Sequence, residues 1–166
     1  MKPKLPKRIP RSLSKEEVRL VLLHADCMDW RNKEECLRNR AIIRTFLYTG
    51  MRLSELLALK HDEINIEERQ IYIHQGKGKK DRIVPIHHDL LPYLKSYLNG
   101  KKAALFAFTS LRSECPLTPK NLYRIIKKIR KESGIYFSPH MLRHTMAKNC
   151  IESNINPFVL QAILGH

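Results

Sequence analysis

The sequence predicts an α+β fold that is mostly helical and carries one small three-stranded antiparallel sheet. Three observations lead to this prediction. Apolar residues recur three or four positions apart over most of the 166 residues, as in helices that bury one face. Between residues 64 and 86 the apolar residues alternate with polar ones instead, which is typical of strands. Three dipeptides that combine an N-cap residue with a proline mark further helix starts.

The first residues are predicted to form a linker. Residues 1–11 hold three prolines and five basic residues. Proline fixes φ and lacks a backbone donor, so this stretch is expected to be extended. The sequence therefore predicts a basic, proline-rich linker over residues 1–13, with another domain before it, and one folded domain over residues 14–166.

Helical patterns dominate the first third of the folded domain. Residues 14–17 have the spacing of a capping box and open a helix. A second helix is predicted from about Glu35 to Leu47, ended by Gly50. Residues 52–59 are short and leucine-rich, so this segment is predicted to be buried.

The predicted sheet follows, and helices then resume. Residues 64–66, 71–73 and 82–86 are predicted as the three strands. The last two are joined by residues 75–80, a turn rich in Gly and Lys that should be exposed. One helix is predicted over residues 88–98, and three more start at the dipeptides Thr118-Pro119, Ser138-Pro139 and Asn156-Pro157.

The charge balance points to nucleic acid as a partner. The chain has 31 Lys and Arg against 16 Asp and Glu, a formal net charge of +15. Such a surface attracts polyanions, because neutralised phosphates release their counterions. The alternatives are a soluble protein that happens to be basic and a protein that sits on an anionic lipid surface. The sequence shows no apolar run that could span a bilayer and no signal peptide at its start, and its four cysteines lack metal-site spacing. A cytoplasmic location is expected.

Two short motifs in the first half carry charged residues suited to a phosphate. In the first, Gly50 ends a helix and places Arg52 and Glu55 three residues apart on an otherwise apolar segment. A buried arginine is costly unless it is paired, so this pair has a purely structural interpretation as well as a functional one. In the second, Lys77 stands near the tip of the Gly-Lys turn and can reach a phosphate or donate a proton. A solvated turn is the alternative.

Two further motifs lie towards the end of the chain. His140, Arg143 and His144 are spaced so as to share one face of a new helix, whose positive N-terminal end favours an anion. The histidine pair also suggests zinc, but no glutamate base or third ligand is evident nearby, and a phosphoryl site fits better. The last motif, Leu164-Gly165-His166, would present an imidazole at the tip of a helix.

Together and in this order, the four motifs resemble the tyrosine recombinase, or phage integrase, family. The matching patterns are Thr-Gly-Met-Arg-Leu-Ser-Glu-Leu, Gly-Lys-Gly-Lys-Lys-Asp-Arg-Ile-Val-Pro, His-Met-Leu-Arg-His-Thr and Leu-Gly-His. The resemblance covers nearly the whole chain from Ser12 onward. It implies the catalytic-domain fold of that family, incomplete at its C-terminus and without the family's N-terminal core-binding domain.

The resemblance also implies a role for each motif residue. Arg52 and Arg143 would clamp the non-bridging oxygens of the scissile phosphate, whose charge grows in the pentavalent state. Lys77 would protonate the departing 5′ oxygen, His140 would act as a general acid/base near the nucleophile, and His166 would hydrogen-bond the phosphate.

Two further residues, Glu55 and His144, match supporting positions of the family. The implied reaction is transesterification through a 3′-phosphotyrosine, with no metal and no cofactor, because arginines do the charge work. In the family the nucleophilic tyrosine follows the last histidine by about nine residues. This chain ends at His166 and none of its six tyrosines has the matching place, so the fragment is expected to be inactive.

Double-stranded DNA is the expected partner, together with other recombinase subunits in a tetramer on DNA, and no membrane. The helix after Thr118 has an apolar stripe that should face the core, which leaves its basic residues outward. A solvated basic face is the alternative to DNA contact. The residues expected to contact DNA are Lys79, Lys80, Lys120, Arg124, Lys127, Lys128 and Lys131.

Three other functions remain open at this point. A DNA-binding regulator derived from a recombinase predicts the same basic surface without cleavage. A type IB topoisomerase shares the chemistry and differs in lacking strand exchange between two duplexes. A zinc hydrolase built on His140 and His144 is a more distant third interpretation.

Overall fold

The computed structural model describes residues 11–74, 81–99, 101, 104–111 and 115–165. This part of the chain contains seven helices and three short strands, which confirms the predicted mostly helical α+β class. The elements in order are α1 (Lys15–Cys27), α2 (Lys33–Thr49), α3 (Leu53–Ala58), β1 (Ile64–Asn65), β2 (Gln70–Ile73), β3 (Arg82–Pro85), α4 (Leu91–Leu98), α5 (Pro119–Ser133), α6 (Pro139–Glu152) and α7 (Pro157–Leu164).

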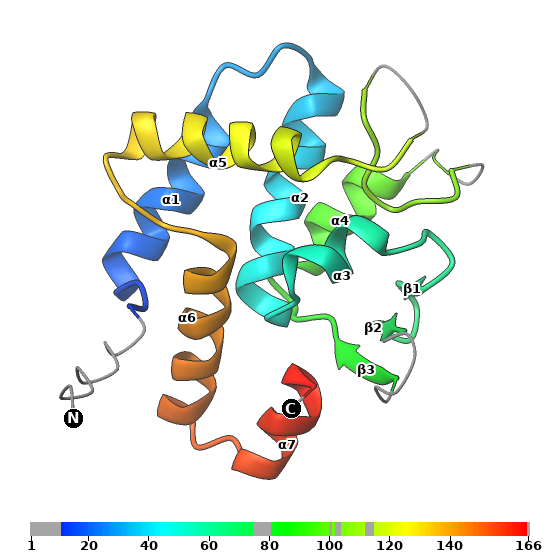
Figure 1. Cartoon of the computed structure of the whole chain (residues 1–166), viewed down its shortest axis with the longest axis vertical. Helices are drawn as coiled ribbons and strands as arrows, with labels where there is room; N and C mark the ends of the chain where they lie inside the picture. Colours follow the sequence, from blue (N-terminus) through cyan, green and yellow to red (C-terminus); the bar gives the residue numbers. More distant parts are fainter. Residues whose placement is uncertain (1–10, 75–80, 100, 102–103, 112–114, 166) are drawn as a thin grey trace, which may run out of the picture.

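Helix α2 runs through the middle of the molecule and organises the others around it. It packs against α1, α4 and α6, while α5 crosses over α1 at one end (Figure 1). At the other end, α7 contacts α6 and β3, so the last helix lies beside the sheet. This arrangement brings the start of α3, the middle of α6 and the end of α7 into one region.

The predicted helix starts are confirmed by their capping contacts. The Ser14 hydroxyl accepts a hydrogen bond from the Glu17 backbone, and the Glu17 carboxylate accepts one from the Ser14 backbone, which completes the capping box. Before α5, α6 and α7, the side chains of Thr118, Ser138 and Asn156 each accept a hydrogen bond from the first turn. Local chemistry therefore sets the start of each of these four helices.

Two helix boundaries differ from the prediction. Helix α2 begins at Lys33, earlier than Glu35, because the Asn32 side chain caps it by accepting from the Glu35 backbone. Helix α4 begins at Leu91 rather than at residue 88. The intervening residues form a turn in which the backbone N–H groups of Leu90 and Leu91 both donate to the carbonyl of His87.

The sheet is antiparallel in the order β1-β2-β3, as predicted. Ile71 pairs with Ile64 on one side and with Val84 on the other, and all three side chains are buried. Arg82 pairs with Ile73 and is buried on the same face. The predicted turn over residues 75–80 lies outside the described residues.

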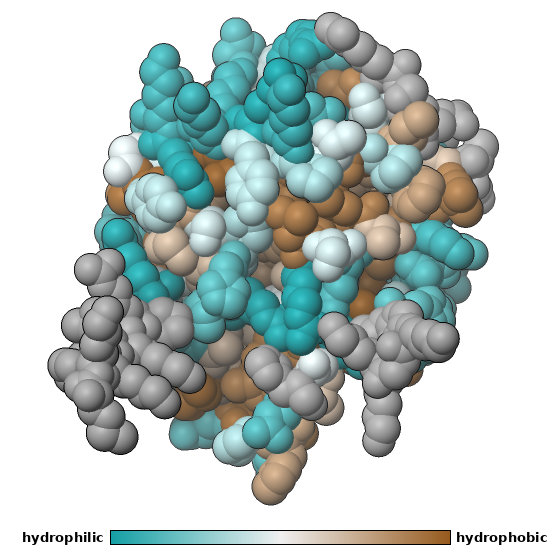
Figure 2. Space-filling model, viewed as in Figure 1, coloured by the Kyte–Doolittle hydropathy of each residue, from teal (hydrophilic) through white to brown (hydrophobic). Residues whose placement is uncertain are grey.

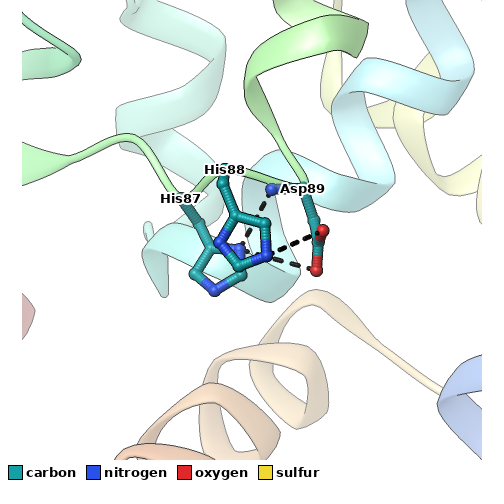
Figure 3. Close-up of side chains that lie close together, drawn as sticks. All are labelled: His87, His88 and Asp89. Carbon is teal, nitrogen blue, oxygen red and sulfur yellow. Dashed lines mark hydrogen bonds and ion pairs between the residues drawn. The ribbon is translucent and has the colours of Figure 1, made fainter.

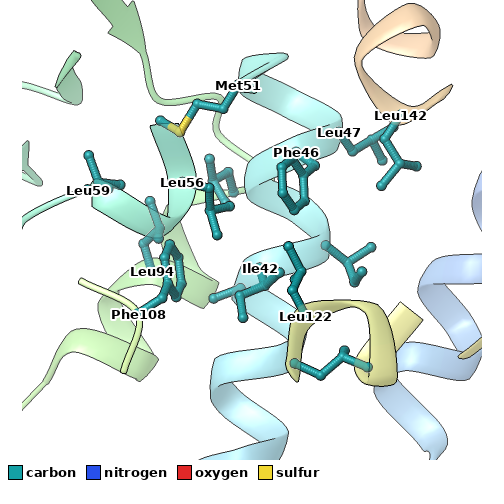
Figure 4. Close-up of a cluster of buried hydrophobic side chains, with 14 of the residues drawn as sticks. Ile42, Phe46, Leu47, Met51, Leu56, Leu59, Leu94, Phe108, Leu122 and Leu142 are labelled. Atoms are coloured by element: carbon teal, nitrogen blue, oxygen red, sulfur yellow. The ribbon is translucent and has the colours of Figure 1, made fainter. Parts of the chain in front are cut away.

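The core lies between α2 and the helices that surround it. Figure 4 shows Ile42 and Phe46 of α2 facing side chains of the neighbouring helices. Packing begins before the first helix, because Leu13 is buried and its backbone N–H donates to the Thr145 hydroxyl. In the part of the chain that the structure describes, no helix combines the length and apolar character needed to cross a membrane.

Candidate functional site

Arg52 stands at the N-cap of α3, directly after a turn that only glycine suits. Gly50 has a φ of 62° and ends α2 in the left-handed conformation. A Cβ added to Gly50 would lie 2.8 Å from the Leu164 side chain and 3.2 Å from the Met146 sulfur. The glycine therefore permits both the sharp turn before Arg52 and the close approach of α6 and α7.

Glu55 is the centre of a network of charged hydrogen bonds. It accepts from the Arg52 backbone at 2.7 Å and from the Arg52 guanidinium at 2.9 Å. Arg82 forms two further hydrogen bonds to the same carboxylate, at 2.9 and 2.8 Å, in a bidentate pair. Burial raises the pKa of Glu55, but the hydrogen bonds and charge of Arg82 and Arg52 outweigh it and hold that pKa at about 2. The carboxylate is therefore ionised at neutral pH.

Sequence reasoning missed Arg82, which the structure places at the heart of this network. Its side chain is buried, at 9% exposure, and reaches Glu55 across the sheet edge. The signal was present, since Arg82 and Val84 alternate with outward-facing residues and so share the inward face of β3. A charged residue at an inward strand position needs a buried partner.

Arg143 enters the same region from α6. Its side chain is buried and donates to the backbone carbonyls of Gly50 and, at 2.7 Å, of Leu164. Burial lowers the pKa of Arg143, the neighbouring charge of Arg52 lowers it further, and Glu55 acts in the opposite direction. Arg52 and Arg143 thus lie in one region of the fold, where Glu55 accepts from Arg52 and Arg143 donates to backbone carbonyls.

The C-terminal end of α7 holds all three arginines. The carbonyls of three consecutive residues accept from them: Ile163 from Arg82 at 2.7 Å, Leu164 from Arg143 at 2.7 Å, and Gly165 from Arg52 at 3.2 Å. The last carbonyls of a helix have no partner within the helix and carry partial negative charge. They offset part of the positive charge of the cluster and fix the direction of each guanidinium group.

The predicted histidine pair lies on α6, near its N-terminal end. His140 and His144 approach each other with 2.8 Å between their Nε2 atoms, and their rings meet edge to face. Burial lowers the pKa of His144, and the nearby positive groups of His140 and Arg143 lower it further. Among the described residues, no third Cys, His, Asp or Glu joins this pair to make a three-ligand metal cluster.

Four of the predicted site residues lie outside the described residues: Lys77, Lys79, Lys80 and His166. The five predicted DNA contacts on α5 are described, and all of them are exposed. The apolar stripe of this helix is buried, as predicted, and consists of Leu122, Ile125, Ile126 and Ile129. Figure 2 shows hydrophilic side chains standing along the edge of the molecule where α5 lies.

An open recess of about 590 Å³ lies beside the basic face of α5. Its lining includes Arg124 and Lys128 of α5 together with Arg31 and Arg38 from the start of α2 and the segment before it. Lys128 lies over the Trp30 ring, 4.7 Å from its centroid. Arg31 is exposed and extends the basic surface of α5, whereas Arg38 is buried and paired with Glu35. Asp29 and Glu35 also line the recess. Sequence reasoning did not single out Arg31.

The sequence profile of the phage integrase family matches residues 11–166 of this chain. A similar curated protein, the tyrosine recombinase XerA of Pyrococcus furiosus, is 35% identical over 167 residues. That alignment covers 99% of this chain and 56% of the relative. The chain thus spans about half the length of the curated relatives that it matches.

Solved structures of similar proteins share the fold. The crystal structure of XerA recombinase superimposes with a TM-score of 0.84 at 30% identity, covering 97% of this chain and 58% of that one. The XerH site-specific recombinase, solved in a pre-cleavage complex with its difH substrate, gives a TM-score of 0.81 at 28% identity. That match covers 95% of this chain and 47% of the XerH chain.

Proposed function

Because the chain belongs to the phage integrase family, we propose that it is the catalytic domain of a tyrosine site-specific recombinase. It would break and rejoin DNA strands by transesterification through a 3′-phosphotyrosine intermediate. The observation that carries the proposal is the convergence of Arg52 and Arg143, from two distant parts of the chain, around Glu55 and the end of α7.

This convergence suits a phosphoryl group in the transition state. Two guanidinium groups held in fixed directions can bind the equatorial oxygens, where negative charge accumulates. Glu55 and Arg82 act as positioning residues rather than substrate ligands. Glu55 holds the guanidinium of Arg52, and Arg82 holds the carboxylate of Glu55. Arg52 and Arg143 are the proposed phosphate-binding residues.

The remaining roles rest on the family motifs. Lys77 is proposed as the general acid for the departing 5′ oxygen, His140 as a general acid/base, His166 as a phosphate ligand and His144 as a supporting residue. The close pair of His140 and His144 fits this assignment, because a neutral neighbour can orient the imidazole through one hydrogen bond. No metal and no cofactor are needed for this chemistry.

The attacking tyrosine is proposed to lie outside this chain. The hydroxyl of Tyr48 bonds Asp89 and that of Tyr72 bonds Gln70. Tyr93 lies under Arg44, Tyr97 is buried against Phe108, Tyr136 lies against Arg130, and Tyr123 is exposed on α5. These contacts support the interpretation of the six tyrosines as core or surface residues rather than as the nucleophile.

We further propose that double-stranded DNA lies along α5. The proposed contacts are Lys120, Arg124, Lys127, Lys128 and Lys131, with Lys79 and Lys80 from the turn before β3. Arg31, which is exposed in the lining of the recess, extends the same positive surface. Other recombinase subunits would assemble with this domain on DNA in the cytoplasm.

The domain organisation is proposed to follow from the same assignment. Residues 1–13 would connect a core-binding domain to the catalytic domain, which begins at Ser14, with Leu13 already packed against it.

Covalent trapping tests the proposal. Selection from random duplexes first yields the preferred DNA site of this chain. A nicked suicide duplex carrying that site is then incubated with this chain and with a version extended past His166 by the natural C-terminal sequence. We expect a covalent adduct with the extended protein only, because only that version would carry the proposed nucleophilic tyrosine.

Each other outcome of the trapping experiment would contradict part of the proposal. An adduct with this chain alone would make one of its own six tyrosines the nucleophile. The absence of an adduct from both proteins would favour the non-catalytic DNA-binding regulator. Relaxation of supercoiled DNA without exchange between two duplexes would favour a type IB topoisomerase.

A further inference from the structure

A separate polar cluster lies at the junction between β3 and α4. It consists of His87, His88 and Asp89 (Figure 3). One ring nitrogen of each histidine and one carboxylate oxygen lie within 4.8 Å of one another. The residues on either side, Ile86 and Leu90, are buried. The carbonyl of His87 also accepts the Leu90 backbone N–H at 3.0 Å. A backbone anchored at both ends therefore presents three adjacent polar side chains to solvent.

The imidazole of His87 is held in place in a form suited to metal binding. Its ring stacks on Tyr48 with 4.7 Å between centroids and 7° between planes. Its Nδ1 accepts the Asp89 backbone N–H at 3.2 Å, which requires that Nδ1 carries no proton. This lone pair serves one partner at a time, so a metal ion bound at Nδ1 would replace the N–H of Asp89, which is an exposed residue. A metal ion binds an unprotonated ring nitrogen, which is the form of Nδ1 that this hydrogen bond requires.

The Asp89 carboxylate completes the donor set. One oxygen lies 3.1 Å from Nε2 of His88, and the other lies 3.7 Å from Nδ1 of His87. Donors around a tetrahedral zinc ion lie about 3.3 Å apart, because each is about 2.0–2.2 Å from the metal. The two spacings involve different oxygens of the carboxylate, so a zinc ion on one oxygen requires small rotations of the Asp89 and His88 side chains, which are 52% and 75% exposed.

We propose that His87, His88 and Asp89 bind a borderline divalent metal ion such as Zn²⁺, with water completing the coordination. Two imidazole nitrogens and one carboxylate oxygen favour Zn²⁺ over Mg²⁺, which selects oxygen ligands. The His140 and His144 pair is a second place where zinc could contact this chain, but no carboxylate joins it among the described residues. That pair provides the control for the experiment.

The bound ion has a structural role at this junction. It joins the end of β3 to the start of α4 and, through the Tyr48 stack, to the last turn of α2. Tyr48 also donates a hydrogen bond to Asp89, with 3.4 Å between the two oxygens. Because the folded chain would bind the ion more tightly than the unfolded chain, zinc raises the melting temperature.

Calorimetric titration of the metal-free chain with Zn²⁺ tests this site. It is carried out on the double variant His140→Ala/His144→Ala, so that zinc bound by that pair does not contribute. We expect one Zn²⁺ per chain with about micromolar affinity and no binding of Mg²⁺. Adding His88→Ala or Asp89→Asn should weaken zinc binding at least about tenfold. Removing a residue that only hydrogen-bonds a metal ligand already lowers metal affinity by about that factor, and a direct ligand should matter at least as much.

A matched variant separates loss of a ligand from a general effect of losing a histidine. His24→Ala, on α1, should leave zinc affinity and the zinc-induced rise in melting temperature unchanged. Since His88 is highly exposed, its removal should leave the fold intact by circular dichroism. Failure of the double variant to bind zinc, unchanged affinity in His88→Ala, or equal binding of Mg²⁺ would each overturn the proposal.

Discussion

The arginine cluster, formed by Arg52, Arg82 and Arg143, and the basic face of α5 are both positively charged, but the two differ in burial and in hydrogen bonding. Arg82 and Arg143 are buried, and each donates to a carbonyl or carboxylate in a defined direction. The basic residues of α5, such as Lys120 and Lys127, are exposed. Buried charges depend on a few specific partners, whereas exposed charges act mainly through their sum. Single changes should therefore have large effects in the cluster and small, additive effects on α5.

The largest effect expected in the cluster is on the chemical step. In the extended protein, Arg143→Ala should lower the rate of covalent adduct formation at least about 10³-fold, because a directed charge on the phosphate is lost. DNA affinity should change little, since most of it comes from the exposed basic surface. Adduct rates on the suicide duplex, together with binding curves, measure both quantities.

Arg143→Lys serves as the matched variant for this prediction. It keeps the charge but cannot donate to the carbonyls of Gly50 and Leu164 with the geometry of a guanidinium fork. It should restore only part of the rate. An adduct rate of Arg143→Ala close to that of the unchanged protein would remove Arg143 from the proposed site.

The second effect is on stability, and it tests whether Glu55 is the counter-charge of the cluster. Glu55→Gln leaves Arg52, Arg82 and Arg143 close together without the carboxylate, and turns an amide N–H towards an arginine donor. Breaking a buried charged network in this way should lower the free energy of unfolding by about 3–5 kcal/mol. Urea unfolding of this chain measures the change.

The control for this substitution is an exposed carboxylate on the connection between β1 and β2. Glu68→Gln should change the free energy of unfolding by less than about 0.5 kcal/mol. If the two variants lose similar stability, Glu55 does not hold the cluster together in the way its contacts suggest.

The sequence predicts only those members of the arginine cluster that belong to local sequence motifs. Arg52 and Arg143 were found because they sit in motifs with caps and turns that are local in the chain. Arg82 was missed because its role depends on which face of β3 turns inward and on what the sheet edge approaches. The three carbonyls at the end of α7 leave no trace in the sequence at all, since every residue has a carbonyl.

The fold was predictable to a similar degree and for the same reason. Starts set by a capping side chain and a proline, such as Ser138-Pro139, were placed correctly because the determinants are adjacent in the chain. The start of α4 was misplaced because the turn at residues 88–90 depends on buried anchors on both sides of it. The recess lined by Arg31 and Arg38 forms only when α5 packs beside α2, which no local pattern reveals.

A third effect concerns acid. The pKa of Glu55 is lowered from 4.5 to about 2 in the fold, so the unfolded chain takes up this proton first as the pH falls. The stabilisation is therefore complete above about pH 5 and is lost as the pH falls towards 2, with a size of about 2–3 kcal/mol. The difference in stability between this chain and Glu55→Gln should shrink over that interval. An equal difference at pH 2.5 and pH 7 would contradict the assignment.

The smallest single effects belong to α5, where the charges act through their sum. Lys127→Ala should weaken DNA binding by less than about 1 kcal/mol and reduce the slope of log affinity against log salt by about 0.9, the contribution of one phosphate contact. The effect should be the same for unrelated DNA sequences, because a phosphate contact reads no base. Fluorescence anisotropy at several salt concentrations measures both the affinity and the slope.

The matched control for α5 is Lys95→Ala on α4, an exposed lysine outside the basic surface defined by α5 and its recess. It should leave the salt slope unchanged. If Lys95→Ala and Lys127→Ala reduce the salt slope equally, the chain attracts DNA by its net charge alone, and α5 is not a specific DNA-binding surface. If only Lys127 changes the slope, and Lys120 and Lys131 add to it independently, the helix lies along the phosphates, and the contrast with the strongly coupled arginine cluster holds.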